Sequence, residues 1–291
     1  MSILDIFRKR NVNVSPVANA HSTETHKPEH VDSVQVAVEE TMKVEESTFE
    51  HVAPKDNGKL DMVIAFDTTG SMAAYIEDVR KQVSDLIPTL FADNPDLRLG
   101  IVAFGDYCDM KNPQEFGKAY QCLMPTDNEN EIIRFIRESK NTSGGDGDEF
   151  YELVLKKIVE ETPWREGSTR SILLISDANP HPLGYCYNDF VVNNQIDWRK
   201  VAAEAAKERI KIDTVRITNR SWYKELSEMT NGISVPFRSN NKTARLVEAA
   251  VNSRGSELSK AKFAFAMHQA RMNSDKELNA IYESYEKESK I

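Results

Sequence analysis

Cysteine is scarce in this 291-residue sequence, which contains only Cys108, Cys122 and Cys186. An odd number of cysteines without a C-x-x-C spacing argues against a disulfide framework and against a zinc ribbon. We therefore expect three free thiols, which are typical of a reducing compartment.

Long apolar runs and basic clusters are also missing. No stretch approaches the roughly 18 apolar residues that cross a bilayer, so we expect no transmembrane segment. In the first residues, MSILDIFRKR, the charges follow the apolar residues, which is not the order of a secretory signal. These absences favour a cytoplasmic protein. The formal net charge is −9 and no lysine- and arginine-rich stripe stands out, which argues against nucleic acid as a partner.

Residues 11–57 contain no glycine, and Phe49 is their single aromatic residue. A segment of this composition cannot bury enough apolar surface to fold. We therefore interpret residues 1–57 as a disordered tether, in which Ile3 to Phe7 could form one short amphipathic turn. Residues 58–255 are predicted to form the folded domain, and residues 256–291 a helical extension.

Two interpretations of the helical extension stay open. Leu258, Phe265 and Met272 recur at a spacing of seven residues, and Ser274 with Glu277 forms a capping-box pattern that predicts a second helix there. The extension either packs on the domain or binds a partner or another copy of the chain. The sequence does not fix an oligomeric state.

Within the folded domain, apolar strand patterns alternate with helical periodicity. Strands are predicted at residues 60–67, 97–106, 118–125, 170–178, 210–217 and 233–237, and helices at 73–92, 128–139, 148–162, 198–209, 223–232 and 242–253. The alternation is typical of a mostly parallel sheet with helices on both faces. The predicted fold class is therefore α/β, with a doubly wound, mostly parallel six-stranded sheet.

The segment FDTTGSM, residues 66–72, follows the first predicted strand and carries one carboxylate, three hydroxyls and a glycine. A helix cap needs only one hydroxyl, so capping alone does not explain Asp67. The catalytic patterns do not match, because a phosphate-binding loop needs a lysine before its serine or threonine, and no G-x-S-x-G nucleophile elbow is present.

A metal site explains more of this segment. Hard divalent cations such as Mg²⁺ take oxygen ligands. Asp67, Thr69 and Ser71 lie at a spacing of two residues and can turn their oxygens inward from one tight loop, where Gly70 lets the backbone approach closely. Asp177 follows the most apolar predicted strand and would join them, because ligands bind beyond the carboxyl ends of parallel strands.

The D-x-T-x-S pattern, together with the later LLISDANPH (173–181), resembles the von Willebrand factor A (vWA) domain and its metal-ion-dependent adhesion site, MIDAS. The resemblance covers roughly residues 59–255. It implies a Rossmann-like fold with the strand order 3-2-1-4-5-6, in which strand 3 is an antiparallel edge. It also implies Mg²⁺ or Mn²⁺ as the cofactor, and Asp67, Thr69, Ser71 and Asp177 as metal ligands.

The middle loop, NTSGGDGDEFYE (141–152), departs from the family, which usually supplies a threonine there. Its Gly-Gly-Asp-Gly-x-Glu pattern resembles the subgroup found with alpha-type protein kinases and in several bacterial regulators, and it implies Asp146 as the ligand in the threonine's place. Thr142 and Asp148 stay alternatives for this ligand. No kinase domain follows in this sequence, so kinase activity is not implied.

Three neighbouring residues are weaker candidates. His181 lies four residues after Asp177 and could line the metal face, but a lone histidine in a proline-rich turn is more often structural. Asp106 and Asp109 could contact the ligands from behind.

These features predict a non-enzymatic, metal-dependent protein-interaction or scaffold module. A protein partner would reach the metal through an acidic or a water-bridged ligand. Three carboxylates around the ion favour the water-bridged form, because like charges repel a fourth carboxylate. The alternative is an enzyme, a metal-assisted phosphohydrolase that uses the same aspartates.

Overall fold

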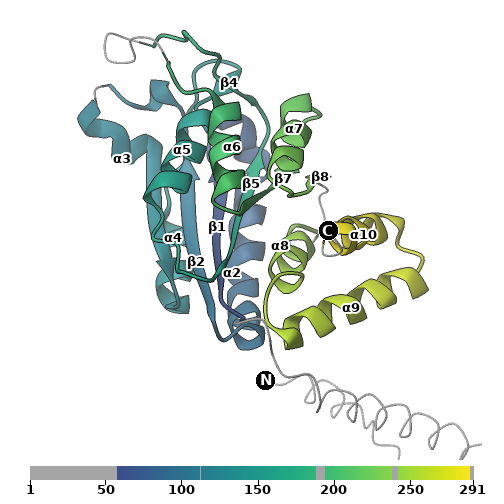
Figure 1. Ribbon diagram of the computed structural model, residues 1–291. Helices are drawn as coiled ribbons and strands as arrows, with labels where there is room; N and C mark the ends of the chain where they lie inside the picture. Colours follow the sequence, from purple (N-terminus) through teal and green to yellow (C-terminus); the bar gives the residue numbers. More distant parts are fainter. Residues whose placement is uncertain (1–57, 112, 188–193, 238–241, 289–291) are drawn as a thin grey trace, which may run out of the picture. The chain divides into compact units, whose positions relative to one another are not determined.

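The computed structural model describes residues 58–111, 113–187, 194–237 and 242–288. Six strands form one sheet in the order β3-β2-β1-β5-β7-β8 (Figure 1). Strand β3 pairs antiparallel with β2, and the other neighbouring pairs are parallel, which confirms the predicted fold class and strand order. The strands are β1 (Leu60–Asp67), β2 (Leu97–Phe104), β3 (Tyr120–Thr126), β5 (Thr169–Ser176), β7 (Ile210–Arg216) and β8 (Ser234–Pro236).

Helices cover both faces of the sheet. Successive strand side chains point to opposite faces, so β1 sends Met62 and Ile64 to one face and Val63 and Ala65 to the other. A strand that is apolar on both sides is typical of a parallel sheet between two helical layers. The helices on the Met62 face are α2 (Ile76–Asp93), α4 (Glu129–Glu138) and α8 (Lys242–Asn252), and those on the Val63 face are α5 (Tyr151–Glu161), α6 (Trp198–Lys207) and α7 (Ser221–Met229).

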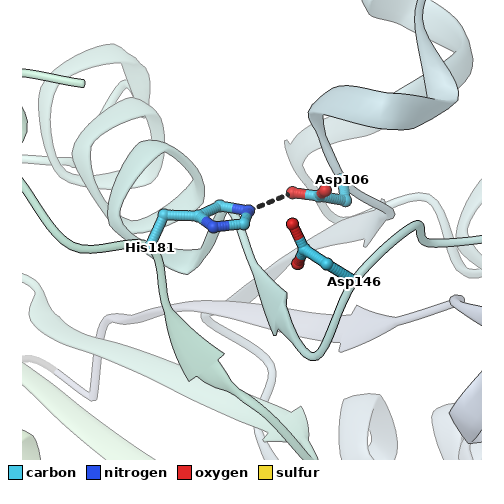
Figure 2. Close-up of side chains that lie close together, drawn as sticks. All are labelled: Asp106, Asp146 and His181. Carbon is cyan, nitrogen blue, oxygen red and sulfur yellow. Dashed lines mark hydrogen bonds and ion pairs between the residues drawn. The ribbon is translucent and has the colours of Figure 1, made fainter. Parts of the chain in front are cut away.

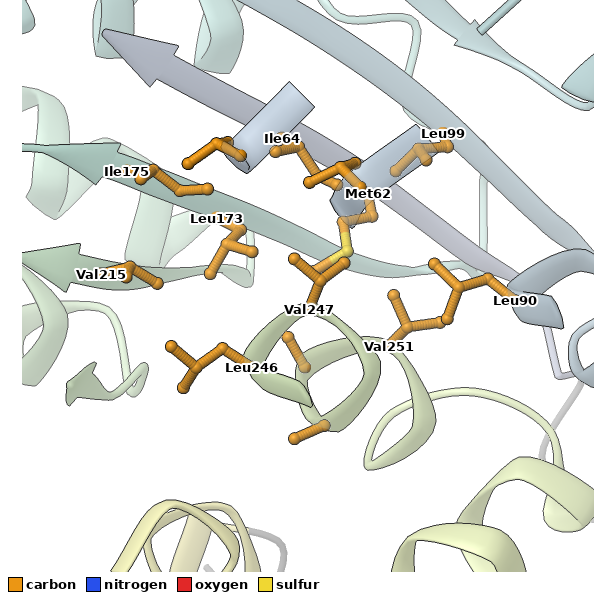
Figure 3. Close-up of a cluster of buried hydrophobic side chains, with 14 of the residues drawn as sticks. Met62, Ile64, Leu90, Leu99, Leu173, Ile175, Val215, Leu246, Val247 and Val251 are labelled. Atoms are coloured by element: carbon orange, nitrogen blue, oxygen red, sulfur yellow. The ribbon is translucent and has the colours of Figure 1, made fainter. Parts of the chain in front are cut away.

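The core on the Met62 face lies between the central strands and α8 (Figure 3). Met62 of β1 and Leu173 of β5 are fully buried, and Val247 of α8 is buried with them. Burying one such side chain contributes roughly 1.5–3 kcal/mol relative to leaving it exposed. The packing makes the centre of the sheet a rigid platform for the loops at the strand ends.

The helix expected at residues 148–162 begins only at Tyr151, because Asp148 and Glu149 form the two-residue strand β4. Strand β4 pairs in parallel with β6 (Asn179–Pro180), directly after β5. The pairing ties the middle loop to the loop after β5 and buries Glu149. The other short elements are η2 (Gly70–Ala74), η3 (Tyr107–Asp109), η4 (Pro113–Glu115) and α3 (Phe116–Ala119).

The predicted cap of the last helix at Ser274 is wrong. An N-cap residue has an extended backbone, whereas Ser274 has a φ of 55°. The cap is the next residue, Asp275, whose Oδ1 accepts hydrogen bonds from the backbone nitrogens of Glu277 and Leu278, each at 3.1 Å. The helix, α10 (Lys276–Glu288), therefore begins one residue later than the pattern indicates.

The helical extension, α9 (Glu257–Met272) and α10, packs against α8 (Figure 1). Tyr285 of α10 is buried and donates a hydrogen bond to Asp213 Oδ2 of β7 at 3.2 Å. Asp213 is fully buried and also accepts a hydrogen bond from Arg254 Nη2 at 2.9 Å. The extension is thus tied to the sheet through polar contacts. The three apolar residues at seven-residue spacing are exposed: Leu258, Phe265 and Met272. Their role in binding a partner stays a prediction.

Two expectations about the whole chain concern cysteine and membranes. Cys108, Cys122 and Cys186 carry free thiols, as expected. Across the described ranges, the helices are too short or too polar to pass through a bilayer.

Replacing Arg254 with alanine should lower the free energy of unfolding by about 3–5 kcal/mol, because Asp213 would keep a buried charge without its partner. Arg245→Ala is the matched control, since Arg245 pairs with Glu248 on the surface, and we expect it to cost at most about 1 kcal/mol. Urea unfolding followed by circular dichroism measures both changes. Equal changes in the free energy of unfolding would show that the buried pair contributes no more to stability than the surface pair.

Candidate metal centre

Three loops meet at one edge of the sheet because β1 lies between β2 and β5. The strands are parallel and in register, with Asp67 opposite Phe104 of β2 and Phe66 opposite Ile175 of β5. Strand order reverses at β1, and in doubly wound sheets the crevice beyond the strand ends at this point binds ligands. The loop after β1 carries the FDTTGSM segment, and the loops after β2 and β5 carry Asp106 and Asp177.

The loop after β1 gathers its oxygens as the spacing predicts. Asp67 is fully buried, and its Oδ1 accepts hydrogen bonds from the backbone nitrogen and the hydroxyl of Thr69, at 2.8 and 2.6 Å. The hydroxyl of Tyr151, at the start of α5, donates to Asp67 Oδ2 at 2.5 Å. Thr69 Oγ1 lies 3.2 Å from Ser71 Oγ, and Ser71 is exposed. The hydroxyl of Tyr151 therefore fixes the buried side of the cluster, and Ser71 lies on its solvent-exposed side.

Asp177 joins this cluster from the end of β5. It is 9% exposed, and its Oδ1 is a buried oxygen without a hydrogen-bond partner among the described residues. Burial raises the pKa of Asp177, while a hydrogen bond with Ser71 and the charge of Arg220 oppose that rise. The structure thus brings together four of the residues predicted from the sequence: Asp67, Thr69, Ser71 and Asp177.

Glu149 also belongs to this cluster, and the sequence prediction missed it. A Cβ at Gly144 would lie 2.9 Å from Glu149 Oε1 and 3.2 Å from Thr69 Cβ, so the two side chains meet beside this glycine. Burial, followed by the charges of Asp67 and Asp106, raises the pKa of Glu149 to about 10. Its Oε2 is buried with no hydrogen-bond partner in the described part of the chain. The available signal was the glutamate that closes the Gly-Gly-Asp-Gly-x-Glu pattern.

The middle loop is fixed between the loops after β1 and β2. The backbone nitrogen of Thr142 donates to Thr68 O, and that of Gly70 donates to Ser143 O, both at 3.0 Å. Asp109 accepts hydrogen bonds from the backbone nitrogens of Ser143 and Gly144, at 2.7 and 3.3 Å. Asp109 therefore acts by holding the loop that carries Glu149.

Thr142 and Asp148, the two alternative ligands from the middle loop, both form hydrogen bonds with other side chains. The Thr142 hydroxyl forms a 3.0 Å hydrogen bond with the Thr68 hydroxyl. Asp148 Oδ1 accepts a hydrogen bond from Asn179 Nδ2 at 3.1 Å, across the β4–β6 pair. Both contacts are made with the neighbouring loops.

Asp146 lies in a second group of side chains (Figure 2). Its Oδ2 accepts a hydrogen bond from the Tyr185 hydroxyl at 2.9 Å, and one ligand atom from each of Asp146, Asp106 and His181 lies within 4.8 Å of the others. The role of Asp146 as a ligand beside Asp67 stays a prediction. His181 does more than shape a turn, because its buried ring is hydrogen-bonded to Asp106 at 2.7 Å.

The electrostatics of the Asp67 cluster fit a cation. Burial raises the pKa of Asp67 to about 7, and the charge of Asp177 adds to the rise, although the hydrogen bonds from Thr69 and Tyr151 oppose it. Asp67 is thus coupled through its charge to Asp177 on one side and to Glu149 on the other. Glu149 and Asp177 each have a buried oxygen without a hydrogen bond from any described residue. Carboxylate and hydroxyl oxygens are the ligands that Mg²⁺ and Mn²⁺ prefer.

Comparisons with known proteins identify the family of this chain. The family model of the von Willebrand factor type A domain matches residues 61–252. The alpha-protein kinase vwkA of Dictyostelium discoideum is 28% identical over 162 residues, which cover 53% of this chain but only 24% of that protein. Among solved structures, the conserved hypothetical protein BatB from Bacteroides thetaiotaomicron is similar, with a TM-score of 0.44 and 16% identity over 65% of this chain and 95% of BatB. Because the family model spans most of the folded domain, we conclude that this chain belongs to the von Willebrand factor type A domain family.

Proposed function

We propose that this chain is a non-enzymatic protein-interaction module whose binding depends on a divalent cation held at the Asp67 centre. This centre consists of Asp67, Thr69, Ser71, Glu149 and Asp177. Membership of the vWA family supports an interaction module. The observation that carries the metal dependence is the fully buried Asp67, which is coupled through its charge to the buried carboxylates of Asp177 and Glu149 and lies beside the exposed hydroxyl of Ser71.

The chain's own residues divide the work at this centre. Thr69 and Tyr151 fix both oxygens of Asp67, so this carboxylate is oriented before any ligand arrives. Ser71 is exposed and hydrogen-bonded to Asp177, which marks the side from which a partner approaches. A bound Mg²⁺ or Mn²⁺ would offset the carboxylate charge and offer its remaining coordination positions to oxygen ligands.

The charge of the centre selects the partner group. Asp67, Glu149 and Asp177 carry three negative charges when ionised, one more than a divalent cation neutralises. A carboxylate on the partner would therefore meet residual negative charge, whereas an amide, a hydroxyl or a water bridge would not. We infer a protein partner that presents a neutral or water-bridged oxygen, with Glu149 supplying the third carboxylate that the sequence prediction assigned to Asp146.

The name of the Dictyostelium relative refers to a kinase, but the matched region is a quarter of that protein. We propose no kinase or phosphohydrolase activity for this chain. His181, the histidine of the second group, contacts Asp106 and is not hydrogen-bonded to any ligand of the Asp67 centre within the residues described. Turnover of phosphoesters is therefore an outcome of the test below.

Asp67→Ala should abolish Mn²⁺ binding at this centre, and Glu149→Gln should weaken it by about tenfold or more, because each removes a negative oxygen ligand. Isothermal titration calorimetry measures both, with the exposed Asp127→Asn as the control for the loss of one surface charge. Unchanged affinity in Glu149→Gln together with a loss in Asp146→Asn would restore Asp146 as the third carboxylate.

Mn²⁺ affinity should rise by at least about tenfold between pH 6 and pH 8, because the carboxyls of both Asp67 and Glu149 must lose their protons to bind the ion. With a pKa of about 7, Asp67 is mostly protonated at pH 6 and mostly ionised at pH 8, and a cation must displace the proton. The raised pKa therefore weakens binding on the acidic side, which fixes the sign of the change. Titrations in buffers of matched ionic strength test this, and a flat affinity across the range would contradict it.

The function itself is tested by affinity capture on the immobilised chain, with Mg²⁺, with EDTA, and with Asp67→Ala in place of the wild type. We expect one set of bound proteins that requires both Mg²⁺ and Asp67, and no Mg²⁺-dependent hydrolysis of phosphoester substrates. Capture that is insensitive to EDTA would refute the metal dependence. Turnover that is lost in Asp67→Ala would make the chain an enzyme.

A further inference from the structure

Asp106, Asp146 and His181 form a group that the Asp67 centre does not use. They come from three different loops: the one after β2, the middle loop and the one after β5 (Figure 2). One carboxylate oxygen from each aspartate and one ring nitrogen of the histidine all lie within 4.8 Å of one another. Two carboxylates and an imidazole converging from separate segments is a donor set that binds metals.

Burial sets this group apart from an acidic surface patch. Asp106 is 0% exposed and His181 is 2% exposed. The 2.7 Å hydrogen bond between Asp106 Oδ1 and His181 Nε2 satisfies one atom of each side chain. Asp106 Oδ2 is buried without a hydrogen bond from any residue that the structure describes. A buried carboxylate oxygen without a hydrogen-bond donor destabilises the folded state, and a bound cation removes that cost.

Aromatic packing holds the histidine ring in place. The ring of Tyr185 stacks on the ring of His181 with a centroid separation of 3.7 Å and an interplanar angle of 17°. The hydroxyl of the same tyrosine donates to Asp146 Oδ2 at 2.9 Å. The backbone nitrogen of His181 donates to the fully buried Glu152 at 3.1 Å. Tyr185 therefore positions two of the three candidate ligands together.

The movement needed to bring the three ligands to the distances of a tetrahedral ion falls on Asp146, the exposed side chain of the three. Donor atoms around a tetrahedral ion are roughly 3.3 Å apart for ligand distances near 2.0 Å. Asp146 is exposed and lies between Gly145 and Gly147, so its carboxylate can move inward without disturbing the core. Asp106 Oδ1 and His181 Nε2 are 2.7 Å apart, so a bound ion would replace their hydrogen bond and separate the two atoms slightly.

We propose that Asp106, Asp146 and His181 form a second metal centre, separate from the Asp67 centre, that binds a divalent transition-metal ion such as Zn²⁺. The imidazole ligand favours a transition metal over Mg²⁺, which prefers oxygen ligands alone. The ion would tie the middle loop to the end of β2. The attachment point in that loop, Asp146, lies three residues before Glu149. Only this consequence for Glu149 depends on the proposed function of the Asp67 centre.

The test is a Zn²⁺ titration of the full chain, stripped of metal and kept in excess Mg²⁺ to fill the Asp67 centre. Asp146→Asn and His181→Gln should each weaken the strongest Zn²⁺ site by about tenfold or more, while Mg²⁺ affinity changes by less than about twofold. Substitution by Co²⁺ should give visible absorption bands that His181→Gln alters. The matched controls are the exposed Asp127→Asn and His268→Gln.

Each outcome decides the proposal. Four histidines lie in residues 1–57 and are the same in every variant, so they contribute equally to each titration. Asp146→Asn changes an exposed side chain and keeps the test valid if His181→Gln fails to fold. Unchanged Zn²⁺ affinity in Asp146→Asn overturns the second centre. Zn²⁺ binding that disappears only in Asp67→Ala also overturns it, and leaves the proposed function intact.

Discussion

The parallel pairing of β1 with β2 on one side and β5 on the other is the constraint on which the site depends. It places the ends of three strands at one level, so that Asp67, Asp106 and Asp177 leave the sheet at the same edge. A shift of β1 by one residue would exchange its two faces. Asp67 would then point away from Tyr151 and α5, and its hydrogen bond to that hydroxyl would be lost.

The same edge concentrates negative charge in a buried place. Burial raises the pKa values of Asp67, Glu149 and Asp177. The charge of Asp177 adds to the rise at Asp67, the charge of Asp67 adds to the rise at Glu149, and Arg220 opposes the rise at Asp177. Perturbed carboxylates in such surroundings cluster at functional sites, because their cost to folding is offset when a ligand binds. The proposed metal dependence rests on this electrostatic arrangement more directly than on the fold.

The middle loop contributes to two separate groups of acidic side chains at this edge. Its backbone is held by Asp109 on one side and by the loop after β1 on the other, and Gly144 adopts a φ of +66° where a Cβ would meet Glu149. Beyond that glycine, Asp146 points to Asp106 and His181, and Glu149 points to Thr69. One short segment thus supplies a carboxylate to each group.

The sequence by itself determined the fold class, the strand order and four of the residues that meet at the strand ends. The fold class depends on apolar periodicity, which defines strands and helices. The site residues depend on short motifs, since Asp67, Thr69 and Ser71 lie on one tight loop. It placed the cap of α10 one residue too early, since the left-handed backbone of Ser274 leaves no mark in the capping pattern.

Only the tertiary structure decided which way the middle-loop side chains point. The β4–β6 pair is two residues long and joins segments about 30 residues apart, too short to give a strand pattern of its own. That pairing turns Glu149 inward and Asp148 toward Asn179, because neighbouring strand residues point to opposite sides. Asp146 precedes the strand and lies beside His181. Likewise, the packing of α10 through Tyr285 and Asp213 depends on a contact between residues 72 positions apart, which no local pattern contains.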